Sequence, residues 1–122
     1  MLNQVLPIIR PYKPTLVGSA AYSPTPNDID ILIAVPADQI QRLAMTLLSL
    51  GYQRNIPDPS TTDRLVHSAY SYGKIDIQIC TPENYIKKAQ ANRTINRLRL
   101  HAGRTKRQRY RIYTELYKLM TH

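Results

Sequence analysis

The sequence predicts an α+β fold: a small mixed sheet that carries three aspartates, flanked by helices, with basic helices at the C-terminal end. In residues 28–35 and 74–80, isoleucines recur at every second position, a period of two that is typical of strands, and the aspartates fall on the opposite face. In residues 37–50 and 82–101, the pattern favours helices. With 122 residues, of which 43% are apolar, the chain fits one domain with a modest core.

Each predicted element has a local reason in the sequence. Prolines end the first helix and mark the loop after the first strand, because proline cannot continue a helix. Gly51 is a natural helix stop, and Gly73 can turn a hairpin. Thr81-Pro82-Glu83 supplies a cap residue, a proline at the first helical position and an acid in the first turn. The predicted elements are a helix in residues 1–12, a strand in 15–17, a loop in 20–27, a strand in 28–35, a helix in 37–50, a short strand in 52–54, a loop in 55–63, strands in 64–72 and 74–80, and helices in about 82–101 and 105–120.

The net charge of +9 lies entirely in the C-terminal third of the chain. Residues 1–80 hold six basic and six acidic residues, whereas residues 81–122 hold eleven basic and two acidic ones. This asymmetry indicates a polyanionic partner, and DNA or RNA would be bound mostly without regard to base sequence. The alternative is a solvated basic helix face. The densest basic cluster, and the predicted nucleic-acid-binding set, is Arg104, Lys106, Arg107, Arg109 and Arg111.

Composition argues against several other functions. No window approaches the roughly 18 apolar residues of a membrane span, and the N-terminus lacks the features of a secretory signal, so we expect no membrane partner. The single Cys80 rules out an intramolecular disulfide and a Cys-based zinc site, and it is predicted to be a buried small residue. We therefore expect a reducing, cytoplasmic location. No spacing links Ser, His and Asp residues into a triad, and His67 is predicted to be structural.

Three aspartates on the two isoleucine-rich strands form the candidate catalytic and metal-binding site. Because strand side chains alternate, Asp28 and Asp30 should emerge on one face, roughly 6–7 Å apart. Asp76 lies on the polar face of the second strand and joins the pair if the strands are neighbours. Three such carboxylates would repel one another without a cation, and their hard oxygens suit Mg²⁺ or Mn²⁺. The alternative is a strand entrance with solvated acids.

A small-residue turn, Gly18-Ser19, precedes these strands. Glycine allows a phosphate to approach the backbone closely, and amides at the start of a short helix would point at phosphate oxygens. Gly18 and Ser19 are therefore predicted to bind a nucleotide. Two metal ions about 3.5–4 Å apart could then clamp the attacking and leaving oxygens of an in-line displacement.

The combination of Gly18-Ser19, an eight-residue spacer, Asp28-Ile29-Asp30 and later Lys74-Ile75-Asp76 resembles the signature of the DNA polymerase beta-type nucleotidyltransferase superfamily. The resemblance covers about residues 14–80 and implies a minimal nucleotidyltransferase domain, followed by a basic helical segment at about 82–120. It implies that Gly18 and Ser19 bind the triphosphate and that Asp28 and Asp30 hold both metal ions. It also implies that Asp76 holds the catalytic ion and favours deprotonation of the attacking hydroxyl.

The chain departs from relatives of this superfamily after the Gly-Ser turn. Many relatives place a basic residue there, whereas residues 20–27 contain none. Arg93 and Arg97 on the following helix are the expected substitutes and are predicted to bind the nucleotide. Asn96 to Ala102 is similar to a segment of family X DNA polymerases, but the Tyr-Phe-Thr-Gly-Ser motif that precedes that segment is missing here.

These features predict a metal-dependent nucleotidyltransferase that moves NMP from an NTP to a hydroxyl acceptor. The acceptor is left open between a nucleic-acid end, a protein side chain and a small molecule. The basic C-terminal third favours nucleic acid, whereas minimal relatives that adenylylate a helical toxin partner keep the protein acceptor open. The alternative function is a weak or inactive module of the same fold that binds nucleic acid or a partner protein. Because the chain has no room for a separate nucleoside-binding domain, a partner protein or a homo-oligomer would complete the site.

Overall fold

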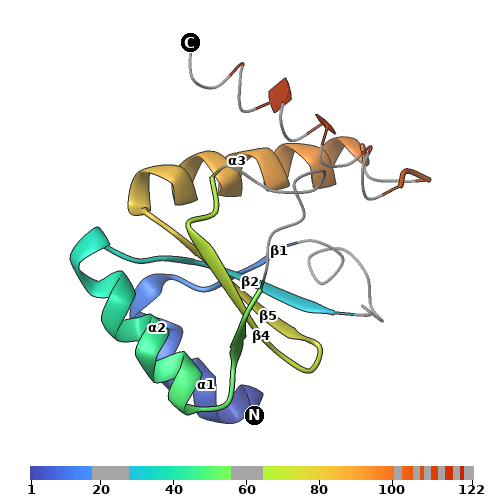
Figure 1. Ribbon diagram of the computed structural model, residues 1–122. Helices are drawn as coiled ribbons and strands as arrows, with labels where there is room; N and C mark the ends of the chain where they lie inside the picture. The colour runs from blue at the N-terminus through green and yellow to red at the C-terminus, as the bar shows by residue number, and fades with distance from the viewer. Residues whose placement is uncertain are drawn as a thin grey trace.

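A computed structural model describes residues 1–17, 28–55, 65–100 and 103–105, together with residues 108, 111–112, 115–116 and 119. The elements within these residues are α1 (Leu2–Ile9), η1 (Arg10–Tyr12), β1 (Thr15–Val17), β2 (Ile29–Ala34), η3 (Ala37–Gln39), α2 (Ile40–Ser49), β3 (Gln53–Arg54), β4 (Ser68–Tyr72), β5 (Ile75–Cys80) and α3 (Pro82–Leu98). Figure 1 shows the sheet between two helical layers, with α1 and α2 on one face and α3 on the other.

The strands form one mixed sheet in the order β1-β2-β5-β4-β3. β2 and β5 run parallel, and the other neighbouring pairs are antiparallel. β4 and β5 form the predicted hairpin, in which Gly73 takes a positive φ of 58° that suits glycine. The predicted α+β class with a mixed sheet is therefore confirmed.

The main core lies between the sheet and the helices α1 and α2. The isoleucines of β2 and β5 alternate onto this face as predicted, so that Ile33, Ile77 and Ile79 have no exposed surface. Val5 and Ile9 from α1 and Leu43 and Leu47 from α2 complete the same cluster. This layer holds the two central strands together.

A smaller apolar cluster lies on the other face of the sheet, under α3. Val17, Leu32 and Cys80 are buried there, and Val66 and Tyr85 pack against them. The prediction that Cys80 is a buried small residue is confirmed. The cluster fixes α3 against β1, β2 and β5, which include the aspartate-bearing strands.

Several predicted boundaries shift by a few residues. β4 begins at Ser68, so the strand predicted over 64–72 is shorter. The helix predicted over 82–101 ends at Leu98, because Arg99 adopts the left-handed conformation and Leu100 N donates to Ile95 O at 3.0 Å. Thr81 occupies the N-cap position but makes no side-chain cap bond. Pro82 at the first position, with its fixed φ, suffices to start the helix.

The loop predicted over 20–27 lies outside the described residues, as does most of the loop predicted over 55–63. The basic helix predicted over 105–120 is described only in part, so its bounds stay a prediction.

Tyr52 carries a buried hydroxyl that has no hydrogen-bond partner within the described parts of the chain. Burial, and to a smaller extent the neighbouring Tyr72, raise the pKa of Tyr52. The Tyr52 hydroxyl therefore ionises at a higher pH in the folded state than in the unfolded chain. Its contribution to the free energy of unfolding is fully present below about pH 10 and is lost as the pH rises further.

We expect Tyr52→Phe to leave the free energy of unfolding unchanged or to raise it by about 1 kcal/mol at neutral pH, because an unsatisfied hydroxyl is removed. The alkaline loss of stability should also become shallower. Urea unfolding at neutral pH and above about pH 10 measures both effects. Tyr72→Phe is the comparison variant: its side chain is exposed, and it removes only the smaller contribution to the raised pKa of Tyr52, so its effect should be smaller. A large loss of stability in Tyr52→Phe would show that the hydroxyl has a partner.

Candidate functional site

One row of residues crosses the sheet and brings two of the three aspartates together. Asp30 of β2 and Asp76 of β5 are direct partners in the parallel register. The row continues to Val17 on one side and to Ser71 and Gln53 on the other. Residues directly opposite one another in a sheet point to the same face. Asp30 and Asp76 therefore lie side by side on the face that α3 partly covers.

Asp28 lies at the entrance of the same strand. It is exposed, and it comes one residue before the start of β2. The backbone N of Ile29 donates to Lys74 O at 2.8 Å, which aligns the beginnings of β2 and β5. In the described parts of the chain, no three His, Cys, Asp or Glu residues gather closely enough to hold a metal ion. The structure thus pairs Asp30 with Asp76, and Asp28 as a third ligand stays a prediction.

Asp76 is held by a short chain of polar side chains. Asn55 Nδ2 donates to Asp76 Oδ1 at 2.8 Å, and Ser71 Oγ donates to Asn55 Oδ1 at 2.6 Å. Gln78 Nε2 lies 3.4 Å from the other carboxylate oxygen of Asp76. Such contacts fix the orientation of the Asp76 carboxylate.

Asn55 is a site residue that the sequence did not indicate. It follows β3, and its backbone N donates to Ala69 O at 2.9 Å, which continues the pairing of β3 with β4. This bond places the Asn55 side chain where it reaches across β4 to Asp76. In the sequence, Asn55 opens a stretch rich in loop-forming residues, and no local pattern signals its contact with an aspartate 21 positions away.

The helix α3 presents an unusual buried face to the sheet. Its buried residues include the polar Lys88 and Asn92, each with only 6% exposure, beside Ala89, Ala91 and Ile95. Asn92 Nδ2 donates to Lys88 O at 2.9 Å, one turn back. No local pattern in the sequence predicts that Lys88 and Asn92 are buried.

Tyr85 anchors the first half of α3 to the edge strand β1. Its hydroxyl donates to Lys13 O at 2.8 Å and lies 2.5 Å from Thr15 Oγ1. Its ring packs against the cluster that contains Leu32. These contacts connect α3 to the chain just before the predicted phosphate-binding turn, so the helix is fixed relative to the strands that carry the aspartates.

The predicted nucleotide-binding arginines lie on the exposed side of α3. Arg93 and Arg97, four residues apart, line an open pocket of about 550 Å³ with Gln90 and Thr94. Helical spacing puts this pair on the side of α3 away from the buried Lys88 and Asn92. The structure therefore brings Arg93 and Arg97 together, but not on the helix face that meets the sheet.

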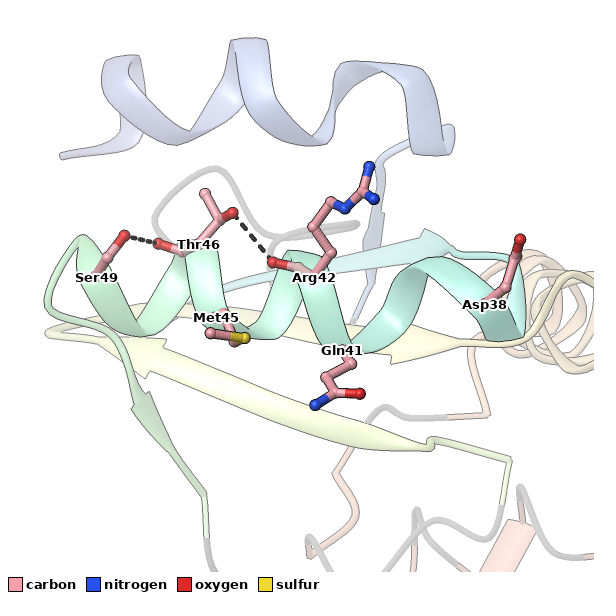
Figure 2. Close-up of a pocket in the computed structure, with 6 residues that line it drawn as sticks. All are labelled: Asp38, Gln41, Arg42, Met45, Thr46 and Ser49. Carbon is pink, nitrogen blue, oxygen red and sulfur yellow. Dashed lines mark hydrogen bonds between the residues drawn. The ribbon is translucent and has the colours of Figure 1, made fainter.

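A second pocket, of about 520 Å³, lies on the outer surface of α2 (Figure 2). The polar bonds drawn there are local to the helix: Thr46 Oγ1 donates to Arg42 O at 3.1 Å, and Ser49 Oγ donates to Thr46 O at 2.7 Å. The helix α2 packs on the isoleucine face of the sheet, opposite the aspartates. This pocket is therefore separate from the candidate site. Its lining residues are Asp38, Gln41, Arg42, Met45, Thr46 and Ser49.

Several predicted site residues cannot be placed. Gly18 and Ser19, the predicted phosphate-binding turn, lie outside the described residues. In the basic cluster, Arg104 and Arg111 are exposed, and Arg111 has helical backbone. The other members, Lys106, Arg107 and Arg109, also lie outside the described residues.

Comparison with known proteins gives no family assignment, because no family model, no curated protein and no solved structure matches the chain. Among the described residues, no helix is long and apolar enough to cross a membrane. Function must therefore be argued from the aspartate pair, the residues around it and the distribution of charge.

Proposed function

We propose that the protein is a metal-dependent nucleotidyltransferase that transfers NMP from an NTP to a hydroxyl acceptor. One observation carries the proposal: Asp30 and Asp76 are direct partners on adjacent parallel strands and share one face of the sheet. The isoleucines of these two strands point to the opposite face and form the core there. The paired carboxylates therefore have no role in the apolar core. Their pairing creates a concentrated negative site to which a cation and a triphosphate can bind.

The residues present fit a magnesium site of the kind that shares its ion with a substrate. Mg²⁺ is commonly bound by one or two carboxylates together with waters and substrate phosphates. Asp30 and Asp76 would supply these carboxylates, and Asp28 is the proposed third ligand. Two Mg²⁺ ions, or Mn²⁺ in their place, would neutralise the triphosphate and the developing negative charge.

The residues of the chain would position the reactants. Asn55 holds one oxygen of Asp76, so the carboxylate keeps a single orientation toward the site. Gly18 and Ser19 would bind the triphosphate through the backbone. Asp76 would favour removal of the proton from the acceptor hydroxyl, while pyrophosphate leaves from the opposite side of the transferred phosphorus.

The proposal is tested by incubating the protein with radiolabelled NTPs and Mg²⁺ or Mn²⁺. The acceptors are a DNA primer-template, RNA, a protein mixture and the protein alone. We expect transfer of label to one acceptor, and EDTA should abolish it. No transfer to any acceptor with either metal, together with no NTP binding, would overturn the proposal.

Asn55→Ala should slow transfer by roughly 10- to 100-fold, which is typical when a residue that orients a metal ligand is removed. The physical reason is that Asp76 loses its 2.8 Å bond and its fixed orientation. Single-turnover rates at saturating NTP measure the effect. Gln41→Ala on α2 is the matched control, because that side chain lies on the opposite helical layer. An unchanged rate in Asn55→Ala would show that the orientation of Asp76 is unimportant.

A second candidate function is a weak or inactive module of this fold that binds nucleic acid or a partner protein. The charge distribution favours nucleic acid, because residues 81–122 carry the whole net charge of +9. The pair Arg93 and Arg97 adds an exposed pocket on α3 with two guanidinium groups. In the enzyme, the same surface would hold a nucleic-acid acceptor. We also propose that a partner protein or a second copy of the chain completes the nucleotide site.

The double variant Arg93→Gln/Arg97→Gln should weaken RNA or DNA binding and lower the slope of log K against log salt by about 2, roughly 1 for each phosphate contact. Fluorescence anisotropy with a labelled oligonucleotide over a range of salt concentrations measures this slope. Arg10→Gln/Arg42→Gln removes two exposed arginines from the opposite side of the sheet and serves as the control. Equal slopes in the two double variants would exclude a specific role for the α3 pocket.

A further inference from the structure

Lys88 differs from the other basic residues of α3 in its burial. It is only 6% exposed, although lysine is rarely buried in proteins. Its neighbour Lys87 is more exposed and pairs with Glu83 at 3.8 Å, one turn away on the helix surface. Arg93 and Arg97 are exposed on the outer side of the helix. Lys88 is therefore the basic residue that the described part of α3 turns toward the sheet.

The face of the sheet under α3 is the one that carries Asp30 and Asp76. α3 begins where β5 ends and runs back across the sheet (Figure 1). At about 1.5 Å per helical residue, Lys88 lies about 9 Å from the start of α3. At about 3.3 Å per strand residue, Asp76 lies about 13 Å back from the end of β5. Lys88 and Asp76 therefore lie about 9 Å and about 13 Å from the junction of β5 and α3, on two elements that contact each other.

A buried ammonium group requires negative charge nearby, because removing a charge from water is costly without a compensating partner. A polyphosphate bound beside the sheet would supply such negative charge. Lysine binds phosphate as a point charge, which does not require the planar geometry of arginine. Lys88 can therefore interact with the phosphates of a nucleotide held at the aspartates.

We propose that Lys88 binds the polyphosphate of the nucleotide and supplies the positive charge that residues 20–27 lack. The inference rests on the proposed nucleotidyltransferase function and adds to it a specific residue. From the sequence, Arg93 and Arg97 are the residues predicted to bind the nucleotide. Lys88 takes this role here, because Arg93 and Arg97 lie on the outer side of α3. Lys88 should then distinguish triphosphates from monophosphates, since only the former extend beyond the transferred phosphate.

The test is calorimetric binding of ATP and of AMP, each with Mg²⁺, to the full chain and its variants. Lys88→Met should weaken ATP binding by about 10-fold or more, the loss expected for one charge-assisted bond, and AMP binding much less. Lys88→Arg should restore most of the preference for ATP. Lys87→Met is the matched control, because it removes the adjacent lysine from the helix surface and should bind ATP as the wild type does.

If the wild type binds ATP and Lys88→Met binds it equally well, Lys88 is structural and this inference is wrong, while the proposed function stands. If the wild type binds no nucleotide with Mg²⁺, both are overturned. If Lys88→Met does not fold, an NMR measurement on the wild-type protein tests the same inference. The ¹³Cε NMR signal of Lys88, assigned with Lys88→Arg, should move with ATP and remain in place with adenosine. A signal that ATP at saturation leaves unmoved would also overturn the inference.

Discussion

Asp76→Asn should abolish nucleotide transfer while the protein remains folded. The substitution keeps the size of the side chain and an oxygen that can accept the 2.8 Å hydrogen bond from Asn55. It removes one of two negative charges that face each other across β2 and β5. Losing a single electrostatic contact to the transition state typically costs about 10²- to 10³-fold in rate, and losing a metal ligand should cost at least as much.

The measurement is the single-turnover rate with Mg²⁺ and labelled NTP, compared with Asp30→Asn and Asp28→Asn. Asp30→Asn should equal Asp76→Asn in effect, since the two residues are register partners. Asp28→Asn decides whether the exposed carboxylate before β2 joins the site. Asp38→Asn, on the opposite helical layer, controls for the loss of an acid. Transfer by Asp76→Asn at the wild-type rate would exclude Asp76 as a catalytic residue.

Thermal unfolding gives a second measurement that is independent of turnover. A ligand that binds only the folded state stabilises it by about 2.7 kcal/mol at a concentration 100 times its Kd. We expect Mg²⁺ with ATP to raise the melting temperature of the wild type and not that of Asp76→Asn. An equal rise in both proteins would show that the nucleotide binds without this carboxylate.

The sequence predicted the strands that carry the acids because alternation is a local property. Isoleucines on one face of β2 and β5 predict Asp30 and Asp76 on the other; in the structure the isoleucines lie in the core, and the two aspartates are register partners. The order of strands was harder to predict, because pairing joins residues far apart in the chain. From the sequence, Asp76 joins the site only if the two strands are neighbours, and β2 and β5 are adjacent.

The residues that sequence reasoning missed are those whose roles depend on tertiary contacts. Asn55 reaches Asp76 only because a two-residue strand, β3, pairs with β4. Lysine is usually exposed, and α3 is a basic helix with few apolar residues. The sequence therefore does not predict that Lys88 is buried. The inner face of α3 depends instead on how Tyr85 and the Leu32 cluster fix the helix to the sheet.

Leu32→Ala should produce the largest loss of stability on the aspartate face. Leu32 has no exposed surface, and it lies between the strand positions of Asp30 and Ala34 in the cluster that holds α3. Replacing a buried leucine by alanine costs about 2–5 kcal/mol, a large part of the roughly 5–15 kcal/mol that stabilises a typical domain. Urea unfolding, followed by circular dichroism, measures the loss.

Leu47→Ala is the matched variant, because Leu47 is equally buried but lies on α2, in the core on the opposite face. We expect a similar loss of stability in both variants. Only Leu32→Ala should also weaken ATP binding, since it loosens α3, the helix that carries Lys88, the proposed polyphosphate-binding residue. Binding is compared in an osmolyte such as TMAO, which favours the folded state of both. Equal ATP affinity in the two folded variants would show that α3 is not part of the nucleotide site. A loss of ATP affinity in Leu32→Ala alone would link the packing of α3 to nucleotide binding.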